Sequence, residues 1–520
     1  MSKAHRFAVH HPCRSGLVPS SIWAVVRVSP ISREGCRPEL RYGAWLTLGF
    51  LLIQAVWILV VPPFRGADEF DHAYRAAAVA RGEWVASDPV ADGRGVLVTV
   101  PQDIVDAATA QCSSLPYTGP DNCTPAAEEG DGLVRVGSGA GTYYPGFYFL
   151  VGTVARPFDG AVALYVMRLA TAVLASILLL GAATAACRTR SRWPRVGLIL
   201  AVTPMVTYSS SIVAPNGVEM CAALAVWCAL LALARSEADA DRAVLICTLA
   251  ASAGVLVSLR LLGPVFLVMI CLTAVAFDGN RLVGAVRRHP VRASLALLIV
   301  GAAGATFMWW IRGPARVSVP RDPPGSHSIN WIAQLFVWPL QSIGAYPFPD
   351  QPAPATTYAV YALAALAFFV GALLFATRRQ KFVLASSLLV AMLLPVAATA
   401  TTVAERGLIW QGRYGLPFSV GFIVISAQIL AGRTSERIEA RAAVVAVVGM
   451  AVGSLFSLVS VLRAEERRAP SIQDPFWHAP SGALVLALVI LSAAAFGMAL
   501  RSCRLVPGMS NPATRVERSR

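Results

Sequence analysis

A group of ionisable side chains directly follows the first apolar stretch of the sequence. It contains Asp68, Glu69, Asp71, His72 and Arg75. A positioned carboxylate can act as a general base, because it can take the proton of an attacking hydroxyl group. Asp68 and Glu69 are therefore candidates for catalytic residues, and the other three are candidates for residues that orient them.

The same group is also typical of an ordinary helix start. Acidic residues stabilise the positive end of the helix dipole, and Asp71 could pair with Arg75 four residues later. The spacing of apolar residues predicts an amphipathic helix near 68–84 that lies on the outer membrane surface. The residues alone leave both interpretations open.

Three arginines are candidates for binding a phosphate group, namely Arg413, Arg406 and Arg168. The first two lie close together and could bind a phosphate bidentately, although arginines at a membrane edge also commonly extend into water. Arg168 lies within a predicted span, where it needs a hydrated pocket or a carboxylate such as Asp68 or Glu69.

Polar and aromatic residues near these arginines are candidates for lining a substrate site. They are Gln411, Tyr414, Tyr143 and Tyr144. The two adjacent tyrosines begin an aromatic run that is equally typical of an interfacial belt. The glycine-rich segment 137–141 before them predicts a flexible linker.

The composition indicates what kind of scaffold must hold these residues. Of the 520 residues, 56% are hydrophobic and 14% are charged. These values exclude an ordinary cytosolic enzyme, a disordered chain and a fibrous repeat, and they predict an all-α, polytopic helical membrane protein. We expect about 12 transmembrane helices, at 43–61, 161–186, 196–213, 217–235, 243–259, 261–277, 292–311, 355–376, 382–402, 415–431, 442–462 and 481–500.

The predicted domains follow from these spans. Residues 1–42 and 501–520 are expected to be basic, disordered cytoplasmic tails, and 43–500 a membrane domain whose first extracytoplasmic loop is the long segment 62–160. Arg260, Gly263 and Pro264 interrupt 243–277, which we interpret as two spans joined by a tight outer turn.

The net charge of +15 is explained by this topology. With both termini cytoplasmic, Lys and Arg gather on the cytoplasmic side, as the positive-inside rule requires. Anionic lipids are then sufficient partners for the charge, so no nucleic acid is expected. The first span lacks a cleavage motif and is predicted to be an uncleaved anchor in the plasma membrane.

Cysteine and histidine usage does not predict a structural metal site. The ten Cys and seven His are dispersed, without CxxC motifs. Cys112 and Cys123 are the cysteines predicted to face the oxidising compartment, and we expect a disulfide between them. A divalent metal at the three neighbouring acids remains an open alternative.

Three motifs resemble a bacterial polytopic membrane family, domain of unknown function 2142, over residues 43–500. They are Pro62-Pro63 with Asp68-Glu69-Phe70-Asp71-His72 and Arg75, then Tyr143-Tyr144-Pro145-Gly146-Phe147-Tyr148, and Gln411-Gly412-Arg413-Tyr414-Gly415-Leu416-Pro417. A Pro-Asp pair often expected after the third span is Pro215-Asn216 here.

That family in turn resembles class C (GT-C) glycosyltransferases, which take a sugar from a polyprenyl-phosphate carrier on the outer side. The resemblance implies that Asp68 or Glu69 is the catalytic acid/base. It also implies a polyprenyl-phosphate sugar donor, an envelope glycan or lipid acceptor and the bilayer as partners. The alternative is an envelope lipid or polymer translocator, or a non-catalytic envelope assembly factor, although internal repeats typical of transporters are not evident.

Overall fold

The structure is a computed structural model that describes residues 38–189, 191–236, 238–317, 329–347, 350–406, 408, 410–472 and 474–502. The predicted tails lie outside the described residues, except that 38–42 belong to the first helix and 501–502 to the last.

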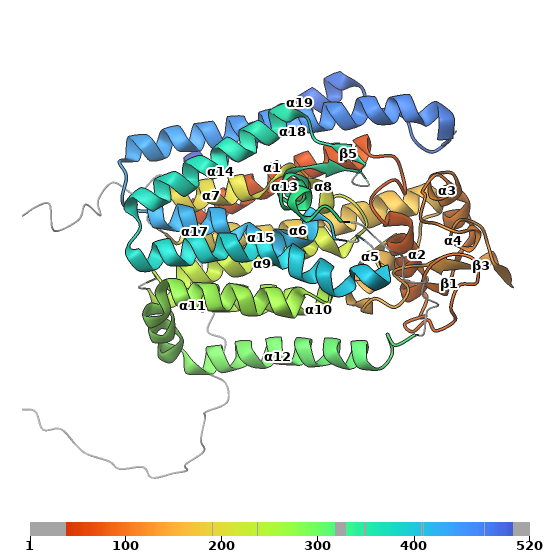
Figure 1. Ribbon diagram of the computed structural model, residues 1–520, viewed down its shortest axis with the longest axis horizontal. Coiled ribbons are helices and arrows are strands. Elements are labelled where there is room, and N and C mark those ends of the chain that lie inside the picture. The colour runs from red at the N-terminus through yellow and green to blue at the C-terminus, as the bar shows by residue number, and fades with distance from the viewer. Residues whose placement is uncertain are drawn as a thin grey trace, which may run out of the picture. The chain divides into compact units, whose positions relative to one another are not determined.

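Long apolar helices make up most of the described chain (Figure 1), and eleven of its segments are long and apolar enough to cross a membrane. The predicted helical membrane protein is therefore confirmed. Lipid offers backbone groups no partner, so each apolar segment satisfies its own hydrogen bonds as a helix. The crossing segments are α1 (Pro38–Val60), α6 (Gly160–Cys187), α9 (Pro215–Leu233), α10 (Asp239–Leu259), α11 (Gly263–Arg288), α12 (Pro290–Arg312), α14 (Ala355–Phe375), α15 (Arg378–Arg406), the run of η1 (Gly412–Gly415), α16 (Leu416–Ser419) and α17 (Gly421–Leu430), α18 (Glu436–Ile472) and α19 (Gly482–Ser502).

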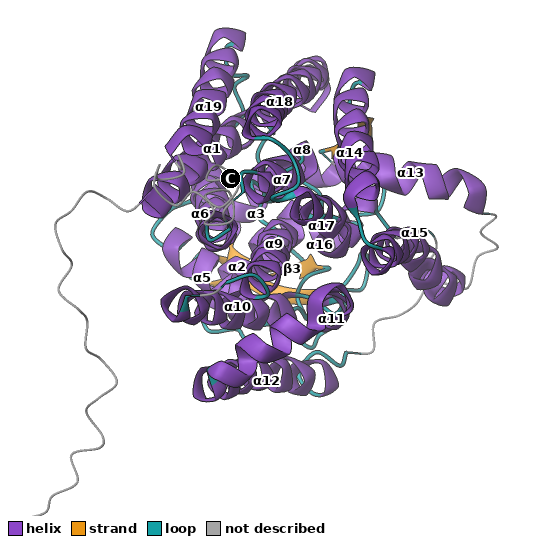
Figure 2. Cartoon of the chain, turned by 90° about the vertical axis from the view of Figure 1, so that its left-hand side faces the viewer, coloured by secondary structure: helices purple, strands orange, loops and turns teal. Residues whose placement is uncertain are grey.

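Helix α9 lies at the centre of the bundle. All of its residues are buried, and α6, α10, α11 and α16 pack around it (Figure 2). By contrast α12 exposes large apolar side chains such as Leu297 and Leu298, as expected for a face in contact with lipid.

The predicted span 196–213 is not one helix. It forms α7 (Trp193–Ala201) and α8 (Pro204–Ser209). Pro204 lacks a backbone N–H and favours the first turn of a new helix, and Thr203 caps that helix by accepting from the Val206 N–H. The segment still traverses the bundle, since its two ends reach Glu439 and Glu69.

The interpretation of 243–277 as two spans is confirmed. Helix α10 ends at Leu259 and α11 begins at Gly263. A Cβ atom added at Gly263 would lie 1.9 Å from the Leu256 carbonyl oxygen, so this turn requires glycine.

The segment 62–160 folds outside the long helices and is not all-α. A three-stranded antiparallel sheet has the order β1 (Val96–Pro101), β3 (Leu133–Ser138), β2 (Ala127–Gly130). Around it lie α2 (Glu69–Ala80), α3 (Gln102–Ser113), α4 (Pro120–Cys123) and α5 (Pro145–Ala155). A disulfide between Cys112 and Cys123 joins α3 to α4. The remaining elements are α13 (Trp331–Ile343), β4 (Ala345–Tyr346) and β5 (Gln351–Pro352).

Helix α2 differs from the predicted surface helix near 68–84. It ends at Ala80, and all of its residues are buried, whereas an interfacial helix exposes its polar face. Strands β1 and β3 and helix α5 pack against it and cover that face. The segment 137–141 is not a flexible linker either, because Gly137 and Ser138 belong to β3 and pair with residues of β1.

A buried ion pair fixes the bend of the chain between α1 and α2, residues 61–68, which is called the corner below. The Arg168 guanidinium donates to both carboxylate oxygens of Glu69, at 2.8 and 2.6 Å, and neither side chain is exposed. The remaining Arg168 donors bind the carbonyl oxygens of Ile58, Val61 and Pro62, at the end of α1. All the donors of this guanidinium are thus used within the protein.

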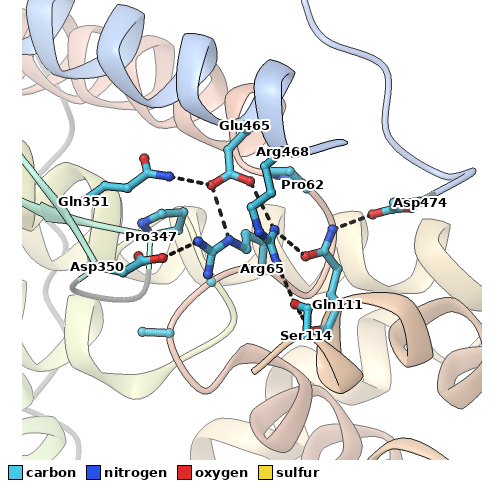
Figure 3. A network of polar contacts seen from close by, with 12 residues as sticks. Pro62, Arg65, Gln111, Ser114, Pro347, Asp350, Gln351, Glu465, Arg468 and Asp474 are labelled. Atoms are coloured by element: carbon cyan, nitrogen blue, oxygen red, sulfur yellow. Dashed lines mark hydrogen bonds and ion pairs between the residues drawn. The ribbon is translucent and has the colours of Figure 1, made fainter. Parts of the chain in front are cut away.

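A second ion network holds the other side of the corner (Figure 3). Arg65 contacts Asp350 at 2.5 Å and Glu465 at 3.2 Å, and Arg468 joins Glu465 to Gln111 of α3. The 37 residues of α18 span roughly 55 Å, which exceeds the hydrocarbon thickness of a bilayer. Its last turns therefore extend far enough to connect the segment 62–160 to the bundle.

Replacing Glu69 by Gln should destabilise the folded protein severely. The substitution leaves the buried Arg168 charge without its counter-charge, and breaking such a pair costs about 3–5 kcal/mol. The check is the thermal unfolding midpoint of the purified protein in detergent. The matched control is Glu128→Gln, because Glu128 is an exposed residue of β2. Equal midpoints for Glu69→Gln and the control would contradict the proposed dependence on this pair.

Candidate active site

Of the three acids Asp68, Glu69 and Asp71, only Asp68 has a partly exposed side chain. Its side chain is 26% exposed, whereas the side chains of Glu69 and Asp71 are almost fully buried. Asp68 precedes α2 with a left-handed backbone (φ 58°) and makes no side-chain cap to the helix. Left-handed backbone in a residue other than glycine is costly and gathers at functional sites.

Two arginines that are far apart in the sequence, Arg94 and Arg413, contact the Asp68 carboxylate. Arg94 donates to Oδ1 at 2.9 Å, and an Arg413 nitrogen lies 3.5 Å from Oδ2. Burial disfavours the ionised carboxylate, but these two positive charges outweigh it and hold the pKa of Asp68 below its ordinary value of 3.8. Asp68 is therefore ionised at neutral pH.

Glu69 has a different environment from its neighbour. Besides Arg168, its oxygens accept from the backbone N–H groups of Val213, at 3.0 Å, and Gly66, at 3.1 Å. With no exposed surface and both oxygens occupied, Glu69 is placed to hold the corner rather than to meet a substrate. The same ion pair withdraws Arg168 from the predicted phosphate site.

Asp71 positions Arg94. One oxygen accepts from the Gly139 N–H at 2.6 Å, and the other contacts Arg94. Burial raises the pKa of Asp71 to about 6, although Arg94 opposes the shift. The sequence did not predict Arg94 as a site residue. It lies in a loop, and the folding of the segment 62–160 brings it to the acids.

His72 and Arg75 do not contact the Asp68 carboxylate. His72 Nδ1 lies 2.8 Å from the Tyr148 hydroxyl, and burial lowers the pKa of His72 to about 3, so it is neutral. Arg75 is fully buried and donates to the carbonyl oxygens of Trp84 and Tyr143, at 2.6 and 3.0 Å. The two residues instead fix the aromatic segment beside the site.

A third arginine, Arg260, joins Arg413 on the bundle side of this site. Arg260 and Arg413 lie 4.6 and 5.3 Å from the ring centre of Tyr414, so both guanidinium groups face the same ring. Arg260 also lies 3.5 Å from Glu219 at the start of α9. The sequence indicated Arg260 only as a break between two spans. A charged residue between two spans also suggests a functional site.

Some of the polar atoms in this region lack partners. Among the described residues, Arg413 Nε, Glu219 Oε1 and Gln411 Oε1 are buried without a hydrogen bond. Buried polar groups are normally paired, so these three atoms mark places where a ligand could bind.

The other predicted lining residues divide between two settings. Tyr143 is exposed and lies edge-on to His72, with ring centres 5.7 Å apart. Tyr144 packs edge-on against Phe307 and Trp310 of α12, which fits an aromatic belt. The side chain of Arg406 lies outside the described residues.

The acids do not form a divalent-metal site in the described part of the chain. Arg94 lies between Asp68 and Asp71 and contacts both, while Glu69 is engaged by Arg168. A guanidinium thus occupies the place where a cation shared by the two aspartates would bind. No group of three or more His, Cys, Asp or Glu able to hold a metal occurs among the described residues.

The chain is similar to a solved membrane-protein structure. The crystal structure of ArnT from Cupriavidus metallidurans bound to undecaprenyl phosphate aligns with a TM-score of 0.43 and 16% sequence identity. The alignment covers 88% of this chain and 77% of that chain. No curated protein matches the sequence.

The sequence also matches a family model over most of its length. The family is described as "Predicted membrane protein (DUF2142)", and the match covers residues 51–422. This range contains Asp68, Arg94, Arg260 and Arg413, and therefore the whole candidate site. The chain belongs to this family of membrane proteins, domain of unknown function 2142.

Proposed function

We propose that this protein is a membrane glycosyltransferase that moves a sugar from a polyprenyl-phosphate carrier to a hydroxyl group of an envelope acceptor. The observation that carries the proposal is the Asp68 carboxylate, which is ionised, partly exposed and flanked by Arg94 and Arg413. A base next to cationic groups is what this transfer needs. The site is expected to face the outer side, as the charge distribution predicts.

Asp68 would serve as the base. The acceptor oxygen forms a bond to the anomeric carbon, its proton passes to Asp68, and the bond between that carbon and the phosphate oxygen breaks. With Arg413 3.5 Å away, Asp68 is a weak base before the donor binds. A donor phosphate that attracts Arg413 would reduce this effect and raise the pKa of Asp68 when the base is needed.

Arg260 and Arg413 would hold the phosphate. The carrier phosphodiester has one negative charge and gains a second when the sugar leaves, so nearby guanidinium groups stabilise the leaving phosphate more than the bound donor. Both arginines face Tyr414, and Arg413 Nε has no protein partner in the described chain.

Replacing Asp68 by Asn should abolish most transfer while the protein remains folded. Loss of a positioned base typically costs about 10²–10⁴-fold in rate. The measurement is sugar transfer by membranes supplied with a panel of radiolabelled polyprenyl-phosphate sugars. Asp131→Asn is the matched control, because Asp131 is an exposed aspartate with a similar left-handed backbone (φ 52°). Wild-type transfer by Asp68→Asn would remove this residue from the mechanism.

Replacing Arg413 or Arg260 by Gln should lower the transfer rate by about 10²–10³-fold, the usual cost of losing a group that stabilises developing charge. Steady-state kinetics with a fixed donor sugar will test this, and Arg156→Gln controls for loss of an exposed arginine near the end of α5. If both variants matched the control, the phosphate would have to bind elsewhere.

The pH profile should report the pKa of Asp68. Because Arg94 lowers that pKa, the rate of the wild type should fall only as pH drops below the ordinary range for aspartate. In Arg94→Gln the pKa of Asp68 rises and the acid limb should move to higher pH, which kcat/KM measured from pH 3 to pH 8 will show. An unmoved acid limb in the variant would mean that Asp68 does not control the rate.

A further inference from the structure

A second cluster of arginines lies at the end of the bundle remote from Asp68. Here α9 ends, α10 begins and the last turns of α11 run past them; Figure 2 views the bundle from this end. A cavity of about 430 Å³ lies between these segments. Its lining includes Arg235, Arg242, Arg281 and Arg288.

The shape of α11 brings two of these arginines to the cavity. Asp278 departs from helical geometry (φ −151°, ψ 55°), which kinks the helix near the end of its apolar part. Arg281 and Arg288 follow this kink and lie seven residues apart, so they fall on one face of the last turns. Between them Gly284 adds no side chain to the cavity, and a Cβ atom there would meet open space.

The other two arginines are only partly satisfied by the protein. The Arg242 side chain is 7% exposed and donates to Asp239 at 2.8 Å and to the Ser236 carbonyl at 2.7 Å. Arg235 donates to the Gln428 carbonyl at 3.0 Å. In both side chains the Nε atom is buried without a partner among the described residues.

Positive charge exceeds negative charge around this cavity. Asp239 contacts Arg242 and also lies 3.4 Å from His289, and Asp278 lies 3.8 Å from Arg281. Among the described residues, these two acids are the ones that contact the arginines lining the cavity or the histidine beside them, so the four arginines outnumber them. Burial lowers the pKa of Arg235, and the charge of nearby Arg281 lowers it further, which is the effect of like charges held close together.

We propose that this cavity is a binding site for a phosphate group with one or two negative charges. A phosphate offers several acceptor oxygens to the unpaired guanidinium N–H groups and neutralises the excess charge. The phosphate can belong to the headgroup of an anionic phospholipid, since basic pockets at helix ends on the cytoplasmic side bind such headgroups. It can also belong to a soluble phosphate compound. The site is distinct from Asp68 and does not depend on the proposed transferase activity.

The test measures ligand-dependent thermal stability of the full chain in detergent, because a ligand that binds the folded state raises the unfolding midpoint. The probes are short-chain phosphatidylglycerol, phosphatidylcholine with the same chains, and inorganic phosphate. Variants are Arg235→Gln, Arg281→Gln and Arg288→Gln; the last two remove exposed side chains and should fold normally. The control is Arg287→Gln, an exposed neighbour on the same helix that does not line the cavity.

We expect phosphatidylglycerol to stabilise the wild type and phosphatidylcholine to have no such effect. Each pocket variant should raise the apparent Kd at least about tenfold, the value of one charge-assisted hydrogen bond. Stabilisation by phosphatidylglycerol alone identifies a lipid ligand, whereas stabilisation by inorganic phosphate identifies a site open to soluble phosphate. The proposal is overturned if neither probe stabilises the wild type, or if Arg287→Gln weakens binding as much as Arg281→Gln.

Discussion

The ion pair between Glu69 and Arg168 is the constraint on which the rest of the structure depends. It joins four segments, namely the end of α1, the start of α2, helix α6 and the residues just before α9, and the last two are far from the first two in sequence. Removing two charges from water is expensive, so such a pair does more to select one arrangement than to add net stability. Here the pair selects the angle at which the segment 62–160 leaves the helical bundle.

The position of Asp68 follows from that angle. Its neighbour Glu69 points into the bundle, while the left-handed backbone of Asp68 turns its carboxylate toward Arg94 and Arg413. The strain of that backbone must be offset by contacts elsewhere. The Glu69 pair on one side and the Arg65 network on the other supply them, because both hold the short segment that leads to Asp68. The adjacent acids therefore differ in role: Glu69 holds the chain in place, and Asp68 presents its carboxylate to the two arginines.

The sequence predicted the features that depend on one segment at a time. Apolar runs predicted the crossing helices, because lipid permits no other backbone structure for them. The disulfide was expected because the predicted topology places Cys112 and Cys123 together in the oxidising compartment. The break at Thr203 and Pro204 and the alternation of Val96, Val98 and Val100 were also local signals, and stronger weight on them would have found α8 and β1.

Features that depend on contacts between distant segments could not be predicted in this way. Whether Asp68 or Glu69 faces inward depends on Arg168, which is about a hundred residues away along the chain. Arg94 and Arg260 belong to the site only because folding brings their loops to the acids. The burial of α2 likewise depends on β3 and α5, since its own sequence is that of a surface helix.

The two arginine clusters differ in how their charge is balanced, and this difference suits different tasks. Near Asp68 each arginine has a carboxylate partner: Arg260 has Glu219, and Arg94 and Arg413 share Asp68. In the proposed transfer, a phosphate bound there would compete with these carboxylates, which would favour release of the doubly charged product. At the remote end the four arginines of the cavity outnumber the two described acids that contact them, Asp239 and Asp278, so an anion bound there has less competition from these acids. Under the two proposals, the cluster near Asp68 is therefore suited to exchanging a phosphate, and the remote cluster to retaining one.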